Sequence, residues 1–367
     1  MARLTRAKQQ EITRTKVLDA AKAEFAEHGF RGTAIDRIAH RADLTRGAVY
    51  SNFPGKLALY LSVLAREAEF APAPPAAAPG ASPGEAMRLM ATTWAERFPR
   101  RHDYDRTGVD TLSSPMLSVD FMPEVRASAH LRRPFAQLIE LDAILLAASM
   151  GNLADGSSFS HYRPIARSAL TMLLCGTQLS FVIPDFVDPD LLVEMCRQVV
   201  DMKLSPQRPR DAVPGPDPVR TSPDTQWNPR RGIVDLLHSR PAELERDGVV
   251  AILGLNRLRA IEELIEGSPD LADIAVVLVC DPVAEVAPLA RLALADFSRS
   301  LRYAFPESAV PTMRFIVDND GALTEGLQSS ASVADTETAL IIRSGNVITR
   351  YIGRGSVRAA AESCSRH

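Results

Sequence analysis

The spacing of apolar residues predicts a helical first part of the chain and a second part in which strands and helices alternate. Between residues 13 and 27, Val17, Leu18, Ala21 and Phe25 recur at helical intervals, so we expect one face of a helix to be buried. The same reasoning, with Gly and Pro as boundary signals, predicts further helices at residues 34–41, 45–53, 56–70, 84–98, 123–148, 162–183 and 190–203.

Beyond residue 231 the pattern changes to short apolar runs. Residues 248–255 and 274–280 are nearly all apolar and of strand length, which is typical of buried parallel strands. Helices are expected at 257–266 and 286–304, strands at 313–317, 339–342 and 346–352, and a last helix at 357–364. This order predicts a βαβ unit followed by a hairpin, with a turn at Ser344-Gly345, and then a helix.

Two low-complexity stretches separate these regions. Residues 71–84 are rich in Pro, Ala and Gly, and residues 205–231 contain seven prolines, which is typical of a semi-rigid linker. We therefore expect a first helical domain at residues 10–70, a second helical domain at 84–204, a linker at 205–231 and an α/β domain at 232–367.

The composition narrows the class of protein. Of the 367 residues 46% are hydrophobic, which excludes wholesale disorder. The sequence contains no uninterrupted apolar run of 18 residues, so we expect no membrane-spanning helix. The N-terminus lacks the apolar stretch of a secretory signal. The four cysteines, Cys175, Cys196, Cys280 and Cys364, are scattered without CxxC or metal-ligand spacing. We expect a cytoplasmic protein that contacts no membrane and holds no metal or cofactor.

A net charge of −3 conceals an asymmetry along the chain. Residues 1–56 contain eleven Lys or Arg and six Asp or Glu, so this segment carries +5 and the rest of the chain −8. A basic segment on an acidic protein favours a surface that binds a polyanion, although a solvated charged face gives the same balance.

Residues 34–53 have the form of a helix-turn-helix motif, in which the second helix enters the major groove of DNA. Thr33 is placed to cap the first helix, with Asp36 three residues later. Apolar residues for the core of the motif are Ile35, Ile38, Ala39, Leu44, Ala48 and Val49. The polar residues left on the second helix are Thr45, Arg46, Gly47, Tyr50, Ser51 and Asn52.

Each of these residue types suits a contact with DNA. The Thr45 hydroxyl and the free N–H groups of the helix start favour a phosphate. Arg46 is suited to a guanine edge or a phosphate, and Gly47 permits close approach of the backbone. Tyr50 offers a hydroxyl, and Lys56 begins the next helix as a phosphate contact.

These residues carry a family resemblance. The segments Gly29-Phe30, Gly32-Thr33, Ile38-Ala39 and Arg46-Gly47-Ala48-Val49-Tyr50-Ser51-Asn52-Phe53, with Phe25 and Lys56, resemble the N-terminal domain of the tetracycline-repressor (TetR) family of bacterial regulators. The resemblance implies DNA contacts from Thr33, Thr45, Arg46, Gly47, Tyr50, Asn52 and Lys56. Asp43 departs from the family, which usually has Gly in this turn, but Asp tolerates a left-handed φ.

By position and helical content, residues 84–204 resemble the ligand-binding and dimerisation domain of the same family. The resemblance implies a homodimer formed by the helices at 162–183 and 190–203; Leu170, Leu173, Leu174 and Thr177 share one face, and Gly176 allows close approach. An ordinary core within one chain explains that face equally well. Candidates to line a pocket for an unknown small-molecule effector are Trp94, Phe98, Met116, Phe121, Met122, Phe135 and Met172, although such residues are more often core.

The region after residue 231 resembles the thioredoxin-like fold. Residues 333–347 match the family segment that carries a cis-proline, but Glu337 stands at the proline position. The redox cysteines would lie near residues 255–258, where the chain has Leu255-Asn256-Arg257-Leu258. Thiol chemistry needs a low-pKa thiolate there, so we expect no catalytic residue in this domain.

Taken together, the sequence predicts a multidomain protein, all-α in its N-terminal two-thirds and α/β after them, that is not an enzyme. We expect a ligand-responsive repressor that binds a pseudo-palindromic double-stranded DNA operator as a dimer. The alternative is a thioredoxin-like thiol oxidoreductase, or a module that binds a protein partner, tethered to DNA by the N-terminal domain.

Overall fold

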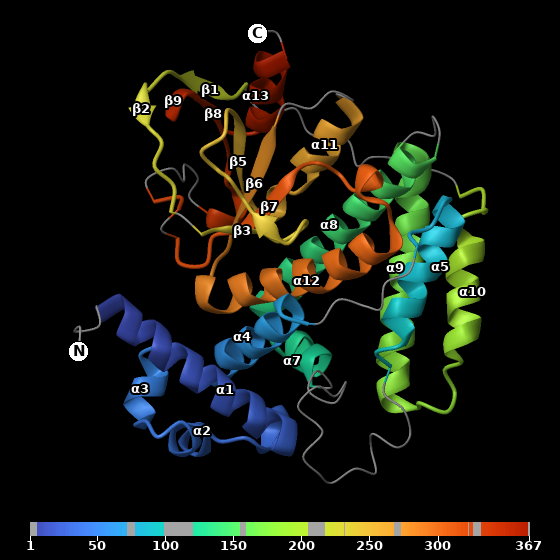
Figure 1. Cartoon of the computed structure of the whole chain (residues 1–367), viewed down its shortest axis with the longest axis vertical. Helices are drawn as coiled ribbons and strands as arrows, with labels where there is room; N and C mark the ends of the chain where they lie inside the picture. Colours follow the sequence, from blue (N-terminus) through green and yellow to red (C-terminus); the bar gives the residue numbers. More distant parts are fainter. Residues whose placement is uncertain are drawn as a thin grey trace.

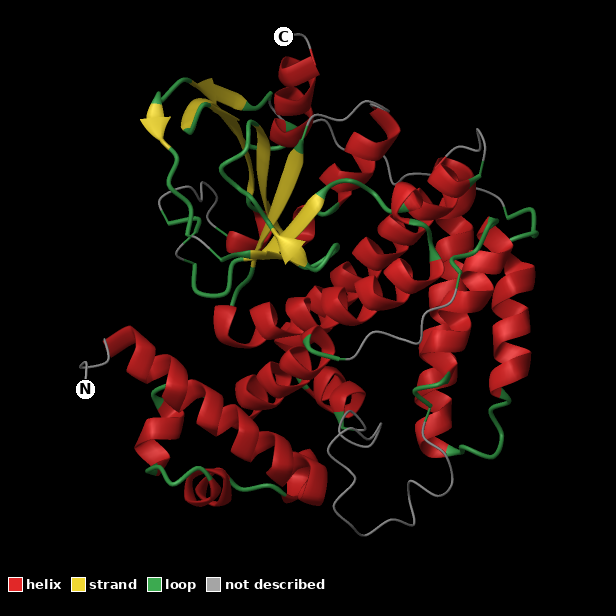
Figure 2. Cartoon of the chain, viewed as in Figure 1, coloured by secondary structure: helices red, strands yellow, loops and turns green. Residues whose placement is uncertain are grey.

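Helices form the first half of the structure and a mixed sheet with flanking helices the second, as the apolar pattern predicts (Figures 1 and 2). The computed structural model describes residues 6–71, 78–98, 120–154, 159–204, 217–230, 232–267, 273–321, 323–325 and 332–365. The helices of the first half are α1 (Arg6–Gly32), α2 (Ile35–Arg41), α3 (Arg46–Tyr50), α4 (Lys56–Glu69), α5 (Pro83–Ala95), α7 (Phe121–Ala127), α8 (Ala129–Leu153), α9 (Phe159–Val182) and α10 (Pro189–Val199).

Local side-chain chemistry sets several helix boundaries. The Ser82 hydroxyl accepts a hydrogen bond from the Glu85 N–H at 3.3 Å, and the Glu85 carboxylate accepts one from the N–H of Ala81, the residue before the cap, so both side chains fix the start of α5. Asp188 caps α10, which has Pro189 in its first turn. The single helix predicted at 123–148 is wrong in one respect: Ser128 has extended backbone angles, and the segment divides there into α7 and α8.

The second half contains a seven-stranded sheet. Its strands are β1 (Val219–Thr221), β2 (Thr225–Gln226), β5 (Gly248–Gly254), β6 (Ile274–Val279), β7 (Arg314–Val317), β8 (Glu337–Arg343) and β9 (Asn346–Ile352), and β3 (Val234–Asp235) pairs with β4 (Arg240–Pro241) outside it. The order is β1-β9-β8-β5-β6-β7, with β2 also on β9. The helices of this half are α11 (Arg259–Gly267), α12 (Val283–Ala304) and α13 (Ser356–Ser365).

The strand pairing follows from the residue pattern. β5 is central, parallel to β6 and antiparallel to β8, and all but the first of its residues are buried. β8 and β9 form the predicted hairpin, and Ser344 and Gly345 in its turn have φ of 49° and 76°, as a two-residue hairpin turn requires. The predicted βαβ unit and hairpin are confirmed.

The two halves share one hydrophobic core. A single cluster of buried apolar residues contains Leu61 of α4 and Leu145 of α8 together with Phe297 of α12 and Val276 of the sheet. Helix α12 runs between the sheet and the helical half and packs on α4, α5 and α8 (Figure 1). The domain boundaries at 205 and 231 stay a prediction, but the apolar core is continuous across them.

Polar contacts join the same two halves. The Arg291 guanidinium of α12 binds the Glu69 carboxylate of α4, with Nε at 2.6 Å, and Arg97 binds Asp296 and Ser300. In a third contact the Asn152 side chain donates to the Ala309 carbonyl oxygen. Since apolar and polar contacts both cross the interface, α12 belongs to the helical half as much as to the sheet.

Helices α8 and α9 are long and apolar enough to cross a membrane by length and composition alone. In α8, 61% of the relevant window is buried inside the protein, as expected for a core helix; in α9 the buried share is 33%. The core explains the apolar composition of α8, whereas α9 keeps an apolar surface outside the core of its own chain.

The shared core predicts that both halves unfold together. The chain has two tryptophans, Trp94 in α5 and Trp227 beside the sheet, whose indole N–H groups donate to Thr177 and to the Leu244 carbonyl. In single-tryptophan variants, Trp94→Phe and Trp227→Phe, we expect coincident fluorescence transitions in urea because one cooperative unit contains both reporters. Two separated midpoints, each matching a step in helical circular dichroism, would contradict a shared core.

Candidate nucleic-acid interface

The N-terminal helices α1 to α4 pack around an aromatic centre. The ring of Tyr60 lies 5.1 Å from those of both Phe25 and Phe30, and all three rings are buried. Ile38, Ala39 and Val49, predicted from sequence as core positions of the motif, are buried in the same cluster. The predicted apolar core of residues 34–53 is thus confirmed at these positions.

The turn between α2 and α3 depends on Asp43. Its φ is 54°, in the left-handed region, and its N–H donates to the His40 carbonyl at 3.1 Å while the Leu44 N–H donates to Ala39. Asp is one of the residues that tolerate this conformation, so the turn forms without the usual glycine.

Helix α3 begins at a threonine cap. The Thr45 hydroxyl accepts a hydrogen bond from the Ala48 N–H at 3.2 Å, which fixes the start of the helix. Val49 points into the core, and the opposite face leaves Thr45, Arg46, Gly47, Tyr50 and Ser51 exposed. The structure therefore brings five of the predicted contact residues together on one surface of one helix.

Gly47 has no internal reason to be a glycine. A Cβ built there would meet only the Thr45 hydroxyl, at 3.8 Å, and its φ is not in the left-handed region. By contrast, a Cβ on Gly254 in the sheet would lie 2.2 Å from the Val333 carbonyl oxygen. The absent side chain at position 47 therefore leaves space on the outer surface of α3 rather than inside the chain.

The charge on this surface comes mainly from Arg46. Its guanidinium lies 5.5 Å from the Tyr50 ring centre and 3.5 Å from an Asp36 carboxylate oxygen. The hydrogen bond with Tyr50, and then the charge of Asp36, raises the pKa of Arg46. These exposed neighbours hold the cation on the outer face of α3, where a nucleic-acid phosphate or base edge would replace Asp36.

Three of the predicted contacts have internal roles. The prediction that Thr33 caps α2 is wrong. Thr33 is 3% exposed, and its hydroxyl donates to the Glu24 and Gly29 carbonyls. The residue before α2 is Ala34, which provides no side-chain cap. The Lys56 ammonium donates to the Phe30 and Thr33 carbonyls, and the Asn52 amide to the Ala48 carbonyl. Lys56 and Asn52 are half-buried, and their bonds to backbone carbonyls hold the helices on which the exposed face of α3 depends.

Sequence reasoning missed Arg14 of α1. Its guanidinium donates to the Asn52 carbonyl at 3.1 Å and lies 4.3 Å from the Phe53 ring centre, so it ties α1 to the end of the motif. The only signal in the sequence was its place among the eleven basic residues at the start of the chain.

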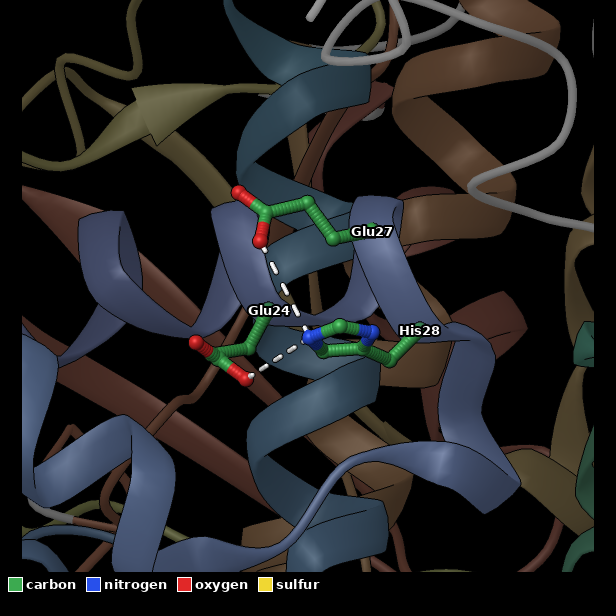
Figure 3. Close-up of side chains that lie close together, drawn as sticks. All are labelled: Glu24, Glu27 and His28. Carbon is green, nitrogen blue, oxygen red and sulfur yellow. Dashed lines mark ion pairs between the residues drawn. The ribbon is translucent and has the colours of Figure 1, made fainter. Parts of the chain in front are cut away.

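Glu24, Glu27 and His28 form a cluster on α1 whose ligand atoms lie within 4.8 Å of one another (Figure 3). The buried Glu24 carboxylate binds Arg41 at 2.8 Å and lies 3.4 Å from Arg37, and Glu27 also binds Arg41. Arginines of α2 therefore already neutralise both carboxylates, and the cluster serves to hold α1 against α2.

Comparisons with known proteins decide the identity of this region. Residues 17–63 match the model described as bacterial regulatory proteins, tetR family. The HTH-type transcriptional regulator SrpR of Pseudomonas putida is 46% identical over 65 residues, which are 18% of this chain and 30% of that protein. The HTH-type transcriptional repressor KstR of Rhodococcus jostii is 36% identical over 81 residues, 22% of this chain and 38% of that protein.

Residues 17–63 are a tetR-family helix-turn-helix domain. The chain spans less than half the length of these curated relatives. Among solved structures, NalD, the secondary repressor of the MexAB-OprM multidrug efflux pump in Pseudomonas aeruginosa, is 22% identical, with a TM-score of 0.32 over 52% of this chain and 95% of that one.

Beyond the tetR-family domain, five of the residues predicted to line an effector pocket, Trp94, Phe98, Phe121, Phe135 and Met172, lie in the apolar core or pack against it. Trp94 and Phe98 are buried, and the rings of Phe121 and Phe135 lie 5.4 Å apart. Met122 and Met172 are half-buried, and Met116 lies outside the described residues. None of the six described residues lines either of the two cavities that we describe, so their ligand role stays a prediction.

The sheet carries an ion pair where the thioredoxin-like resemblance would place redox chemistry. Arg257 binds the buried Glu337 carboxylate with Nε at 2.9 Å, and the other Glu337 oxygen accepts from the Gly355 N–H. Burial raises the pKa of Cys196 and of Cys280 to about 12, and it also raises the pKa of Cys364. These three thiols stay protonated at neutral pH and are poor nucleophiles.

Gly47 allows a test that separates folding from DNA contact. In Gly47→Ala we expect the free energy of unfolding to stay equal or rise by up to about 1 kcal/mol, because alanine favours a helix and meets no clash. We expect DNA affinity to fall at least tenfold, measured by fluorescence anisotropy, because the methyl group blocks close approach. The matched control is Gly84→Ala in α5, where an added Cβ meets nothing within 4 Å. Unchanged affinity in Gly47→Ala would contradict the placement of the interface.

Proposed function

We propose that this protein is a transcriptional regulator that binds an operator in double-stranded DNA as a homodimer and responds to a small-molecule effector. The observation that supports it best is the outer face of α3, where Thr45, Arg46, Gly47, Tyr50 and Ser51 are exposed together on a tetR-family domain. Several relatives of that domain are named as transcriptional repressors, so we propose repression as the outcome. This function places the chain in the cytoplasm, with bacterial DNA.

A dimer is supported by apolar residues that the single chain leaves exposed. On α9, on α10 and in the turn between them these are Leu179, Val182, Ile183, Phe186, Leu191 and Met195. The face expected from sequence is wrong, because Leu170 and Leu173 are buried inside the chain and Thr177 bonds to Trp94. Gly176 does allow close approach, but to Leu192 of α10 in the same chain. Two copies joined through α9 and α10 would present two α3 helices to one duplex.

The sheet is the basis of a narrower proposal. We infer a thioredoxin-like fold for residues 232–367, supported by a parallel β5–α11–β6 unit, an antiparallel β8–β9 hairpin and the final α13. The Arg257–Glu337 pair and the raised thiol pKa values favour a domain without oxidoreductase activity. The contribution of this domain is structural, since buried residues of α12 share one apolar core with Leu61 of α4.

The interface is tested by DNA selected in vitro from a random pool with the full chain. For the selected duplex we expect Arg46→Ala to raise Kd roughly 5- to 150-fold if its guanidinium reads a base. Tyr50→Phe removes one hydroxyl contact and should raise Kd less. Arg246→Ala, an exposed arginine of the α/β half, is the control and should leave Kd unchanged. Failure to select any sequence, or equal Kd values in all variants, overturns the proposed function.

The dimer is tested separately from the DNA surface. Val182 and Leu191 are 76% and 59% exposed, so Val182→Asp with Leu191→Asp should leave the fold intact while converting dimer to monomer in analytical ultracentrifugation. DNA affinity should then fall at least tenfold because the half-sites are no longer bound together. Val219→Asp, 62% exposed on β1, is the control. A parent chain that sediments as a monomer would disprove the dimer.

A further inference from the structure

Two cavities that we describe lie where the helices of the first half meet the α/β half. The larger, of about 890 Å³, lies between the end of α4 and α12, and its Glu69 and Asp320 carboxylates are each bound by an arginine. The smaller, of about 370 Å³, lies between the start of α8 and the carboxyl ends of β5 and β6. Small ligands commonly bind at the carboxyl ends of parallel strands and at interfaces between domains, and the smaller cavity combines both settings.

The lining of the smaller cavity comes from four segments that are far apart in the sequence. They are residues 129–134 at the start of α8, 255–256 after β5, 279–286 from the end of β6 into α12, and 332–335 before β8. The first segment belongs to the helical half and the other three to the α/β half, so neither half forms the cavity alone.

The two halves contribute opposite charges to the lining. Arg133 comes from α8, whereas Asp281 follows β6 and Asp335 precedes β8. The side chains of Arg133 and Asp281 are exposed, and within the described residues neither has an ion pair or a hydrogen-bond partner. The Asp335 carboxylate accepts one hydrogen bond, from the Asn256 amide at 2.9 Å, and keeps further acceptor positions. The cavity therefore offers a cation and two carboxylates that do not neutralise one another.

The start of α8 reinforces the positive side of the cavity. Ser128 precedes the helix without a side-chain hydrogen bond to it, so the positive end of the helix dipole lies beside Arg133 without a cap. The His130 imidazole binds the Glu285 carboxylate of α12, which engages that acid and joins α8 to α12 next to the cavity. An anion is therefore favoured on the α8 side and a cation beside Asp281 and Asp335.

Most of the remaining lining is apolar. Leu255, Val279 and Val286 are buried, and Pro134 and Ala334 are partly buried. A hydrocarbon group placed against them gains free energy by leaving water. The volume of about 370 Å³ lies at the lower end of the range for small-ligand sites, which is roughly 300–1,000 Å³, so the cavity suits a molecule of few atoms.

We propose that this cavity binds an apolar α-amino acid as a zwitterion, and that its binding changes the affinity of the tetR-family domain for DNA. The ligand carboxylate lies at Arg133 and the start of α8, the ammonium group at Asp281 and Asp335, and the side chain on the apolar lining. A ligand with one charge leaves either the guanidinium or the carboxylates without a counter-ion. The regulatory half of this proposal rests on the proposed function; the binding site does not.

Helix α12 leads from the cavity to the tetR-family domain. Val286 lines the cavity, and Arg291, five residues further along the helix, binds Glu69 at the end of α4. Five residues of α-helix span about 7.5 Å. A ligand that holds α8 and the start of α12 together therefore acts on the helix that fixes the end of α4. Because coupling is reciprocal, bound DNA changes the affinity for the amino acid by the same factor.

The site is tested by isothermal titration of the full chain with L-leucine and L-phenylalanine. Each is compared with analogues that keep one charge: 3-methylbutylamine and 4-methylpentanoate for leucine, 2-phenylethylamine and 3-phenylpropanoate for phenylalanine. We expect at least one amino acid to bind at least tenfold tighter than both of its analogues, because each analogue leaves one charge of the cavity unpaired. A smaller preference, or no binding of either amino acid, overturns the site.

Variants then assign the two charges. Arg133→Gln should weaken the preferred amino acid at least fivefold and reduce its advantage over the amine analogue, which has no carboxylate. Asp281→Asn should weaken it at least fivefold and reduce its advantage over the carboxylate analogue. The matched control is Arg132→Gln, the neighbouring exposed arginine of α8, which does not line the cavity and should bind as the parent does. All three side chains are exposed, so these variants should fold. Parental affinity in either cavity variant overturns the placement of the ligand.

The coupling is tested on the selected duplex with and without the preferred amino acid at a saturating concentration. We expect the DNA Kd of the parent and of Arg132→Gln to change at least fivefold, and that of Arg133→Gln to change less at the same concentration. An unchanged parental Kd with the amino acid bound overturns the coupling. If the chain binds no duplex at all, the proposed function fails, while the calorimetric result still decides the cavity.

Discussion

The packing of α12 against α4 is the contact on which the arrangement of this protein depends. Helix α4 is the only helix that belongs both to the tetR-family domain and to the larger body, within the part of the chain that is described. Tyr60 and Val63 of α4 face the aromatic centre of the domain, while Leu61 lies in the core that continues into the sheet. Helix α12 of the α/β half therefore packs on α4, the helix against which α1 and the rest of the tetR-family domain pack.

Charged and polar contacts at both ends of the tetR-family domain add to this packing. At one end the Glu69–Arg291 pair fixes the last residue of α4. At the other, Asp120 before α7 accepts a hydrogen bond from the Phe30 N–H at 2.7 Å, next to Gly29, whose φ of 66° turns the end of α1. A Cβ on Gly29 would lie 3.1 Å from that carboxylate oxygen, so Asp120 packs closely against the end of α1. These contacts join the end of α1 to the residue before α7 and the end of α4 to α12.

The elements were predictable from sequence because their signals are local. The period of Val17, Ala21 and Phe25, the Ser344-Gly345 turn and the apolar runs of β5 and β6 each specify a structure within a few residues. The outer face of α3 was predictable for the same reason, since its exposed residues all lie between positions 45 and 51. Which residues meet across the chain was not: Thr33 reads as a cap but bonds to α1, and Leu170 and Leu173 read equally well as a dimer face or as core.

The linker predicted at 205–231 shows most clearly why the remainder could not be predicted, because residues 219–221 and 225–226 within it form β1 and β2 of the sheet. Its prolines indicate a break in secondary structure, and a break suggests independent domains, but composition says nothing of what the later segment packs on. The apolar spacing of α12 predicts one buried face, which contains Ala287, Ala290 and Leu294, but it does not say what that face packs on. Their place beside the helical half is set by complementary surfaces and by pairs such as Arg97–Asp296, about two hundred residues apart. A cavity formed between such segments, with Arg133 of α8 and Asp281 after β6 in its lining, arises only when both are in place, so it left no motif in the sequence.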